Sequence, residues 1–141
     1  MSEANEVPPK LIPDPDGRNA DFYAHLAGGT LCIQSCASCD ASQHPPRYLC
    51  TRCGSRDLEW RPASGRGRIF SWTVSHRPVD PAWAVDGPWA TLVVEMEEGV
   101  RLVGGLRGLD PSQLRLDLPV EVEIEPATEA FAFIYFRPVP E

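Results

Sequence analysis

The second half of the chain alternates apolar and polar residues over five separate segments. Such alternation is the pattern of a β-strand that buries one face. In the first segment Phe70, Trp72 and Val74 share one face, and in the fourth segment a glutamate follows every apolar residue. The pattern therefore predicts five strands: residues 68–76, 90–96, 100–106, 120–125 and 131–136.

The segments between these strands predict how the strands connect. Glu97-Glu98-Gly99 is a short turn, so the second and third strands form a hairpin. Residues 77–88 hold three prolines and predict a long loop. The connector before the fourth strand begins one helical turn at Asp110-Pro111. Five strands with this connector between the third and the fourth have the order of an OB-fold barrel.

The first half of the chain predicts one helix and a short ribbon. Residues 19–27 predict a helix that Asn19 or Asp21 caps and two glycines end. Its apolar stripe is Phe22, Tyr23 and Leu26. Residues 30–35 and 58–60 predict two short strands. We therefore expect a mainly β protein with three parts: a disordered arm at 1–17, a helix and ribbon at 18–63, and a five-stranded OB-fold barrel at 64–141.

Four cysteines lie between the two short strands, in two pairs. Cys36 and Cys39 form one CxxC pair, and Cys50 and Cys53 form another after an interval of ten residues. This spacing brings four thiolates to one tetrahedral ion, which is the ligand set of a structural zinc site. Zinc is the expected cofactor, and iron bound by the same four thiolates stays open. A filled four-cysteine site has no open position, so it builds structure.

Two other residues near the cysteine pairs are alternative ligands. We expect Cys32 to be a small buried residue, with substitution for Cys36 as the alternative. His44 lies between the pairs, but four cysteines already fill the shell. No nucleophile and base stand at a telling offset, so we expect no catalytic residue in this chain.

Charge is spread unevenly along the chain. The formal net charge is −7, yet residues 32–68 hold six arginines and only three acids. An acidic total disfavours general nucleic-acid binding, which depends on neutralising phosphates. The beginning of the sequence has no apolar segment typical of a secretory signal, and no apolar run is long enough to span a membrane. With cysteines read as metal ligands rather than disulfides, we expect a cytoplasmic protein.

Taken in order, the motifs of the chain resemble those of one known family. They are Phe22-Tyr-x-x-Leu-x-x-Gly, Gln34-x-Cys-x-x-Cys, Pro45-Pro-Arg-x-x-Cys-x-x-Cys-Gly-Ser55 and Ser64-Gly-Arg-Gly-x-Ile-Phe-Ser-Trp-Thr-Val74. This series is similar to the acyl-CoA-associated family of rubredoxin-like zinc ribbon plus OB-fold proteins, over roughly residues 19–137. One departure is Asp40, which stands where a glycine commonly follows the first cysteine pair.

The resemblance implies an accessory subunit without activity of its own. Members of this family are similar to proteins that bind thiolase-superfamily enzymes, including thiolases, archaeal hydroxymethylglutaryl-CoA synthase and aldolases that cut steroid side chains. By resemblance, the chain stabilises a thiolase-like partner and helps to form its acyl-CoA site. Some relatives are fused to a hydratase, and we expect this chain to be too short for that.

Arginines of the basic segment are candidate contacts for the phosphates of acyl-CoA. We select Arg47, Arg52 and Arg66, because a guanidinium group binds phosphate through paired hydrogen bonds. The alternative is a solvated surface that contributes only to solubility.

Aromatic residues are candidate contacts for the partner enzyme. The last strand is apolar on both faces, which indicates a covered surface. We select Phe133 and Tyr135 from this strand and Trp83 from the proline-rich loop, since tryptophan is a common interface anchor. The alternative is ordinary packing within the barrel.

Two other functions stay open on the sequence alone. Zinc ribbons and OB-folds also occur in nucleic-acid-binding modules, although these require a basic groove lined with aromatics. The other possibility is a free-standing acyl-CoA carrier or hydrolase, which turnover by the isolated chain would support.

Overall fold

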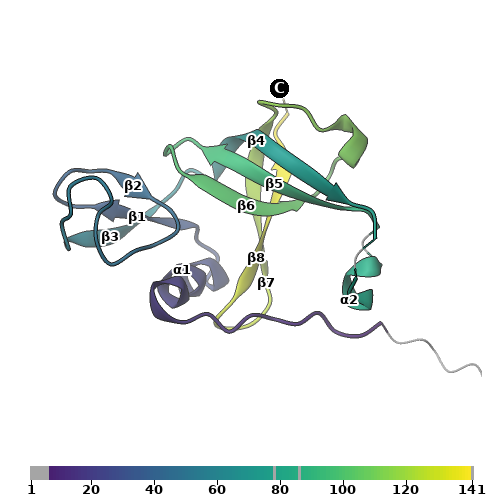
Figure 1. The fold of residues 1–141 in the computed structure, drawn as a ribbon, viewed down its shortest axis with the longest axis horizontal. Helices are drawn as coiled ribbons and strands as arrows, with labels where there is room; N and C mark the ends of the chain where they lie inside the picture. Colours follow the sequence, from purple (N-terminus) through teal and green to yellow (C-terminus); the bar gives the residue numbers. More distant parts are fainter. Residues whose placement is uncertain (1–6, 78, 86, 141) are drawn as a thin grey trace, which may run out of the picture.

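The structure of the chain is a computed structural model that describes residues 7–77, 79–85 and 87–140. Figure 1 shows a small ribbon beside a barrel, with one helix below them. The elements are α1 (Gly17–Ala27), β1 (Cys32–Cys36), β2 (Ser42–Gln43), β3 (Leu58–Pro62), β4 (Arg66–Ser75), α2 (Pro81–Ala84), β5 (Trp89–Met96), β6 (Arg101–Leu106), a 3-10 turn (Pro111–Gln113), β7 (Pro119–Pro126) and β8 (Ala132–Pro138). Of the predicted arm, residues 1–6 lie outside the described residues, and residues 7–16 contain no helix or strand.

The five strands of the second half close into a barrel in the order β4-β5-β6-β8-β7. All neighbouring strands are antiparallel except β6 and β8, which pair in parallel. The connector before β7 holds the expected turn, where the Asp110 carboxylate accepts a hydrogen bond from the Ser112 N–H. The predicted fold class is confirmed: mainly β, with an N-terminal helix, a four-cysteine ribbon and a five-stranded OB-like barrel.

The predicted face of the first barrel strand is wrong at Phe70. The pairing of β4 with β5 shifts between Ile69 and Ser71, so one extra residue enters β4 there. An extra residue reverses the alternation of side chains beyond it. Ile69 is fully buried, whereas Phe70 is 45% exposed and lies under the guanidinium of Arg101. The other two predicted side chains, Trp72 and Val74, are half-buried and pack against the core.

The helix α1 joins the ribbon to the barrel. Its buried residues Phe22 and Leu26 belong to one core cluster that includes Ile33 of the ribbon and Phe136 of the barrel. The N-cap is Asp16 rather than the expected Asn19 or Asp21, and its side chain makes no capping hydrogen bond. No helix in the described ranges has both the length and the apolar composition that crossing a bilayer requires.

The proline-rich loop is more ordered than its composition predicts. It contains the single turn α2, where the Asp80 carboxylate accepts a hydrogen bond of 2.9 Å from the Ala82 N–H. Proline at the first position of a helix loses no intrahelical bond, which explains why the turn starts at Pro81. Positions 78 and 86 of this loop lie outside the described residues.

Candidate metal centre

Two similar turns present the four cysteines. In the first turn the Asp40 N–H donates to the Cys36 carbonyl at 2.8 Å, and in the second the Gly54 N–H donates to the Cys50 carbonyl at 3.0 Å. Asp40 and Gly54 both adopt left-handed backbone angles, with φ of 65° and 76°. The chain therefore builds the same turn twice, once with glycine and once with aspartate.

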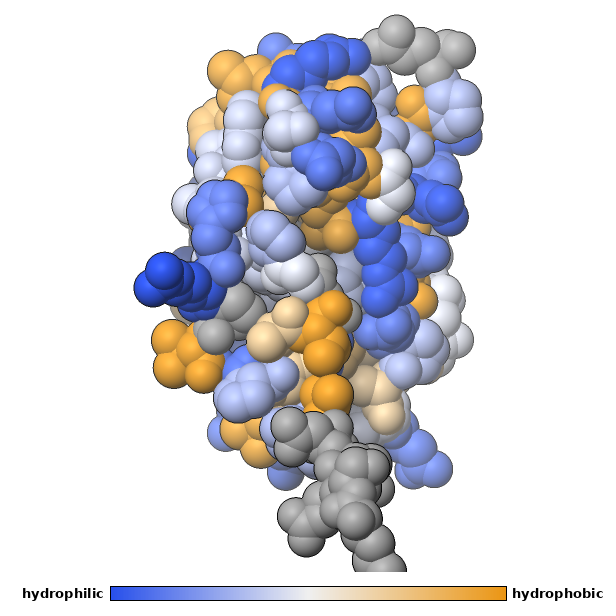
Figure 2. Space-filling model, turned by 90° about the vertical axis from the view of Figure 1, so that its right-hand side faces the viewer, coloured by the Kyte–Doolittle hydropathy of each residue, from blue (hydrophilic) through white to orange (hydrophobic). Residues whose placement is uncertain are grey.

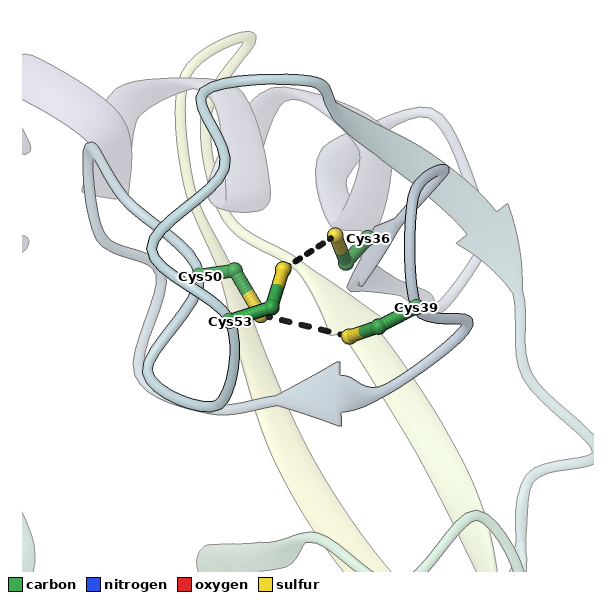
Figure 3. A group of neighbouring side chains, drawn as sticks. All are labelled: Cys36, Cys39, Cys50 and Cys53. Carbon is green, nitrogen blue, oxygen red and sulfur yellow. Dashed lines mark hydrogen bonds between the residues drawn. The ribbon is translucent and has the colours of Figure 1, made fainter.

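The four sulfurs converge on one point between these turns (Figure 3). All lie within 4.8 Å of one another, and the Cys36–Cys53 and Cys39–Cys50 sulfur distances are both 3.6 Å. Four sulfurs placed at the usual zinc–sulfur distance are about 3.8 Å apart, whereas a disulfide needs about 2.05 Å. The residues present therefore fit a four-thiolate metal ion. Among the described residues this is the one group of three or more potential ligands placed to hold a metal.

Backbone N–H groups stabilise part of the thiolate set. The N–H groups of Cys53 and Arg52 lower the pKa of Cys50 to about 6, and the N–H of Cys39 lowers the pKa of Cys36. The N–H of Ser55 also favours the Cys53 thiolate, but the neighbouring sulfurs raise the pKa of Cys53 to about 12. A fourth negative sulfur is therefore unfavourable without a cation at the centre, and a divalent ion supplies that charge.

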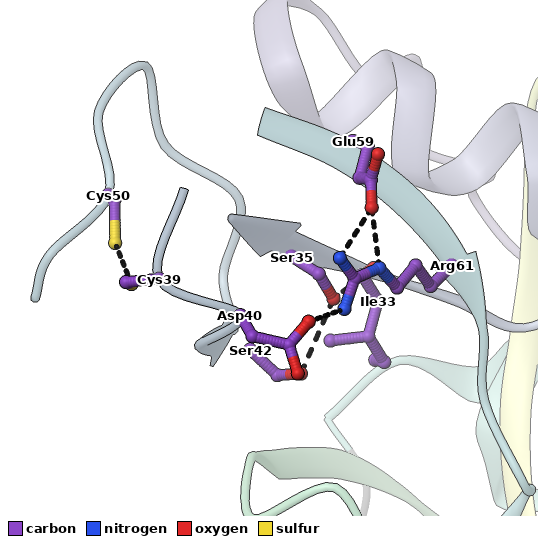
Figure 4. A network of polar contacts seen from close by, with 8 residues as sticks. All are labelled: Ile33, Ser35, Cys39, Asp40, Ser42, Cys50, Glu59 and Arg61. Atoms are coloured by element: carbon purple, nitrogen blue, oxygen red, sulfur yellow. Dashed lines mark hydrogen bonds and ion pairs between the residues drawn. The ribbon is translucent and has the colours of Figure 1, made fainter. Parts of the chain in front are cut away.

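The aspartate in the first turn has a specific partner (Figure 4). The Arg61 guanidinium donates to the Asp40 carboxylate and, through Nε, to Glu59 Oε1 at 2.6 Å. Aspartate tolerates left-handed angles better than most residues. The ion pair with β3 holds the turn in place where glycine is usual, so the departure from the family motif leaves the sulfur geometry intact.

Neither alternative ligand belongs to the sulfur group. Cys32 is 5% exposed, as expected for a small core residue, and burial raises the pKa of its thiol. His44 packs against the ring of Phe22 with centroids 4.9 Å apart. Burial lowers the pKa of His44 to about 4, so this imidazole is neutral at ordinary pH.

Two buried glutamines organise the loop between the cysteine pairs: Gln34, which belongs to one of the quoted motifs, and Gln43, which sequence analysis did not single out. Gln34 bonds both sides of one residue: its Nε2 donates to the Arg47 carbonyl and its Oε1 accepts from the Arg47 N–H, both at 2.8 Å. Gln43 Nε2 donates to Gln34 Oε1 at 2.7 Å and to the Leu49 carbonyl at 3.2 Å. The Thr51 N–H donates to Gln43 Oε1 at 2.9 Å. The sequence feature that could have indicated this network was Gln34, a polar residue within the apolar strand before Cys36.

The structure separates the three candidate arginines. Arg47 and Arg52 are exposed on the ribbon, whereas Arg66 begins β4 of the barrel. Arg66 lines a groove of about 400 Å³ together with Arg68, and Arg47 lines a different, shallow pocket beside Tyr48. No described pocket therefore contains all three.

The structure brings the three candidate aromatic residues together. Ring centroids lie 5.7 Å apart for Trp83 and Phe133 and 6.4 Å apart for Phe133 and Tyr135. Trp89 extends the group, at 4.8 Å from Trp83. Tyr135 is buried, while Trp83 and Phe133 are half-buried. The chain itself, through α2, thus covers part of the second apolar face of β8; a role for these residues in partner binding stays a prediction.

The coloured part of the side that carries α2 mixes apolar and polar residues. Figure 2 shows hydrophobic residues there in small groups separated by hydrophilic ones, within the part that is coloured. A broad apolar patch would mark an extensive interface.

Both halves of the chain match domains of one protein family. Residues 25–59 match the rubredoxin-like zinc ribbon domain of ChsH2, and residues 60–125 match the C-terminal OB-fold domain of ChsH2. The boundary between the two matches lies within β3.

Three curated relatives illustrate the range of proteins to which this chain is similar. A probable enoyl-CoA hydratase alpha subunit of Thermomonospora curvata is 34% identical over 99% of this chain and 44% of its own length. The 3-oxo-4,17-pregnadiene-20-carboxyl-CoA hydratase alpha subunit of Mycobacterium tuberculosis is 35% identical over 82% and 38%. A DUF35 domain-containing scaffold protein of Methanothermobacter thermautotrophicus is 32% identical over 67% and 68%. The chain thus spans about two fifths of each hydratase subunit.

Two solved structures share the fold. A chain of an Ltp2–ChsH2(DUF35) aldolase superposes with a TM-score of 0.81 at 34% identity, over 90% of this chain and 98% of that one. A DUF35 protein of unknown function from Sulfolobus solfataricus has a TM-score of 0.58 at 11% identity, over 84% and 83%. The second likeness concerns the fold alone.

Proposed function

Because the chain belongs to the ChsH2 family, in which a rubredoxin-like zinc ribbon precedes an OB-fold domain, we propose that it is a non-catalytic accessory subunit of a larger enzyme. The proposed partner is a thiolase-like enzyme acting on acyl-CoA, a thiolase or a retro-aldolase of steroid side-chain degradation. The chain stabilises that enzyme in the cytoplasm and helps to form its acyl-CoA site. The observation that carries this proposal is the likeness to a chain of an Ltp2–ChsH2(DUF35) aldolase, over 98% of that chain.

The metal has a structural role in this proposal. Zinc is the proposed ion, because four thiolates fill its tetrahedral shell and leave no position for water or substrate. The ion fixes the two cysteine turns, and these hold the loop between them. The relative from Methanothermobacter thermautotrophicus, which is named as a scaffold protein, supports a structural role for this chain.

A hydratase is a second candidate partner. The two hydratase alpha subunits each contain a region similar to this chain and further sequence that the chain does not match. The chain is then a subunit beside a hydratase rather than beside a thiolase-like enzyme. The identity of the co-purifying enzyme separates the two candidates.

Nucleic-acid binding finds little support in the charge of the barrel. The half-buried glutamates of β7 alternate with apolar residues, and the net charge is −7. Proteins that bind single strands need a positively charged groove with stacking aromatics. Fluorescence anisotropy with single-stranded DNA at low salt tests this alternative directly.

Within the proposed complex, CoA binds in the barrel groove. Arg66 and Arg68 both line this groove, and two guanidinium groups suit a phosphate. Glu95, Glu97 and Asp117 line it as well, so the arginines must outweigh three carboxylates. Calorimetry on the complex checks the contact: Arg66→Ala is expected to weaken CoA binding, and unchanged affinity removes it.

The accessory role is tested by co-purification from the native cells, followed by reconstitution. A tagged chain should recover a thiolase-superfamily enzyme in stoichiometric amount, identified by mass spectrometry. The two purified proteins should then form one species in size-exclusion chromatography with light scattering. The enzyme should be more stable and more active on acyl-CoA with the chain than without it. A chain that stays a lone monomer, or that binds nucleic acid instead, contradicts the proposal.

A further inference from the structure

The loop between the cysteine pairs presents apolar side chains to solvent. Tyr48 is 67% exposed and Leu49 is 45% exposed. They are adjacent, and both line the shallow pocket that Arg47 borders. Large apolar residues that remain exposed side by side are typical of an interaction surface rather than of a solvated loop.

The backbone beneath these side chains is already fixed. Gln34 and Gln43 are 2% and 7% exposed, and they bond the peptide groups of Arg47, Leu49 and Thr51. Every buried side-chain nitrogen and oxygen among the described residues has a hydrogen-bond partner, so this network is complete. Ordering an interface loop upon binding costs free energy, and a loop held in this way avoids most of that cost.

The ring of Tyr48 is also supported from one side. The Arg18 guanidinium of α1 lies over this ring, 5.0 Å from its centroid. A Cβ atom at Gly17 would lie 3.4 Å from the Tyr48 hydroxyl, so the ring lies close to the start of the helix. A supported aromatic ring loses little rotamer freedom when a partner covers it.

Positive charge surrounds these apolar residues. Residues 44–56 contain Arg47, Arg52 and Arg56, all exposed, and no aspartate or glutamate, although the chain as a whole carries −7. Arginine here also offsets the negative charge of a metal–tetrathiolate centre, but that does not require Tyr48 and Leu49 to be exposed. Tyrosine and arginine are the residue types most enriched at the centres of interfaces.

We propose that Arg47, Tyr48, Leu49 and Arg52, the knuckle-loop surface, dock into an apolar pocket with an acidic rim on the partner enzyme. This inference rests on the accessory role proposed above and adds the surface that performs it. It assigns Arg47 and Arg52 to protein carboxylates rather than to the phosphates of CoA. The ribbon lies at the opposite side of the barrel from α2, so this surface is separate from the aromatic group around Trp83 (Figure 1).

The test measures the affinity of purified variants for the co-purified enzyme by biolayer interferometry. Tyr48→Ser/Leu49→Ser should weaken binding by about 30-fold or more, the loss expected when central interface residues are removed. Arg47→Glu/Arg52→Glu should weaken it by at least about 10-fold and reduce its dependence on salt. The controls are Leu116→Ser, at a residue that is 63% exposed, and Arg115→Glu, both on the connector before β7.

Each variant is first shown to contain its metal and to unfold like the wild type, so that a lost ribbon is not mistaken for a lost contact. The controls should stay within about 2-fold of the wild type, which is the range for surface changes outside an interface. CoA affinity of each complex is measured in parallel. Arginine variants that lose CoA but keep the enzyme assign these side chains to phosphates and overturn the proposal.

The remaining outcomes separate this surface from the accessory role. If the Tyr48/Leu49 variant binds the enzyme as tightly as the wild type, the knuckle-loop surface is wrong and the accessory role stands. If the wild type binds no enzyme, both fail. If ultracentrifugation shows a dimer that Tyr48→Ser abolishes, the occupant is a second copy of the chain and the proposal is overturned.

Discussion

Gly105 lies where β6 passes close to the aromatic rings of Tyr135 on β8 and Trp89 on β5. A Cβ atom at this position would lie 2.8 Å from the ring of Tyr135 and 3.1 Å from that of Trp89. The contact with Tyr135 is shorter than Cβ atoms tolerate and the contact with Trp89 is tight, and both rings pack against neighbouring aromatic rings. We expect Gly105→Ala to lower the free energy of unfolding by about 1–3 kcal/mol, as overpacking of a core does.

Urea unfolding measures this effect, with Gly28→Ala as the control. A Cβ atom at Gly28 would lie 3.4 Å from its nearest neighbour, the carbonyl oxygen of His25, and the backbone there is right-handed. Equal stability of the two variants would show that the rings move aside easily.

His44 makes stability depend on pH. Burial lowers its pKa from the ordinary 6.5 to about 4, so the unfolded chain takes up a proton before the folded one does. The stabilisation is complete above pH 6.5 and is lost as the pH falls toward 4. Between pH 7 and pH 5 the loss from this residue is about 2 kcal/mol.

The measurement compares the wild type with His44→Phe, which keeps a ring against Phe22. Protonation of the thiolates is common to both proteins, so the difference in their pH dependence reports His44. Parallel profiles for wild type and His44→Phe would contradict the assignment.

Single residues also show what the sequence predicts and what it does not. The ligands could be predicted because two CxxC pairs specify a tetrahedral set by spacing alone. The departure at Asp40 was visible because a glycine commonly follows the cysteine pair, as Gly54 does in the second pair. Its partner Arg61 was not, because the two are 21 residues apart and meet only after β3 pairs with β1.

At the scale of elements, strands were predicted better than the side chains that they bury. Alternation predicts a strand, but it cannot reveal a bulge. In the sequence Phe70, Trp72 and Val74 alternate regularly, yet in the structure Ile69 is buried and Phe70 is exposed. The two-residue β2 is too short to leave any pattern. Asp80-Pro81 is a typical start of a helical turn and indicated α2, but the prolines around it favoured the prediction of a loop.

The bulge in β4 has a direct test. Ile69 is fully buried and Phe70 is 45% exposed. Ile69→Ala should therefore cost about 2–5 kcal/mol of unfolding free energy, and Phe70→Ala less than about 1 kcal/mol. Denaturant titration of both variants distinguishes this register from the regular strand, for which the larger loss would fall on Phe70.

The ribbon as an element depends on its metal. Elemental analysis should find one zinc ion per wild-type chain, and the same value for Cys32→Ala, since Cys32 lies outside the sulfur group. Cys36→Ser should lose tight metal binding and the order of the ribbon, because a structural zinc site supplies folding free energy directly. Loss of metal from Cys32→Ala would make Cys32 a ligand after all.

For the whole molecule, α1 couples the ribbon to the barrel. Phe22 is 2% exposed and contacts His44 and Trp60 of the ribbon while belonging to the common core. We expect Phe22→Ala to lose about 3–5 kcal/mol, the usual cost of a buried phenylalanine. The unfolding midpoints followed by metal release and by tryptophan fluorescence should shift together. Asn19→Ala, on the exposed side of the helix, is the control. A shift in metal release alone would mean that ribbon and barrel unfold separately.

The arrangement of α1 also bears on the order in which the protein folds on the ribosome. The helix is made before β7 and β8, on which it packs. The ribbon needs only local contacts and its ion, so it can form as soon as Cys53 and β3 emerge. Phe22 can then pack on His44 and Trp60 of the ribbon, but the contacts of the helix with β7 and β8 must wait until the barrel closes. Contacts between distant parts of a chain slow folding and leave apolar surface open to aggregation in the meantime. A partner already present during translation would shorten that interval.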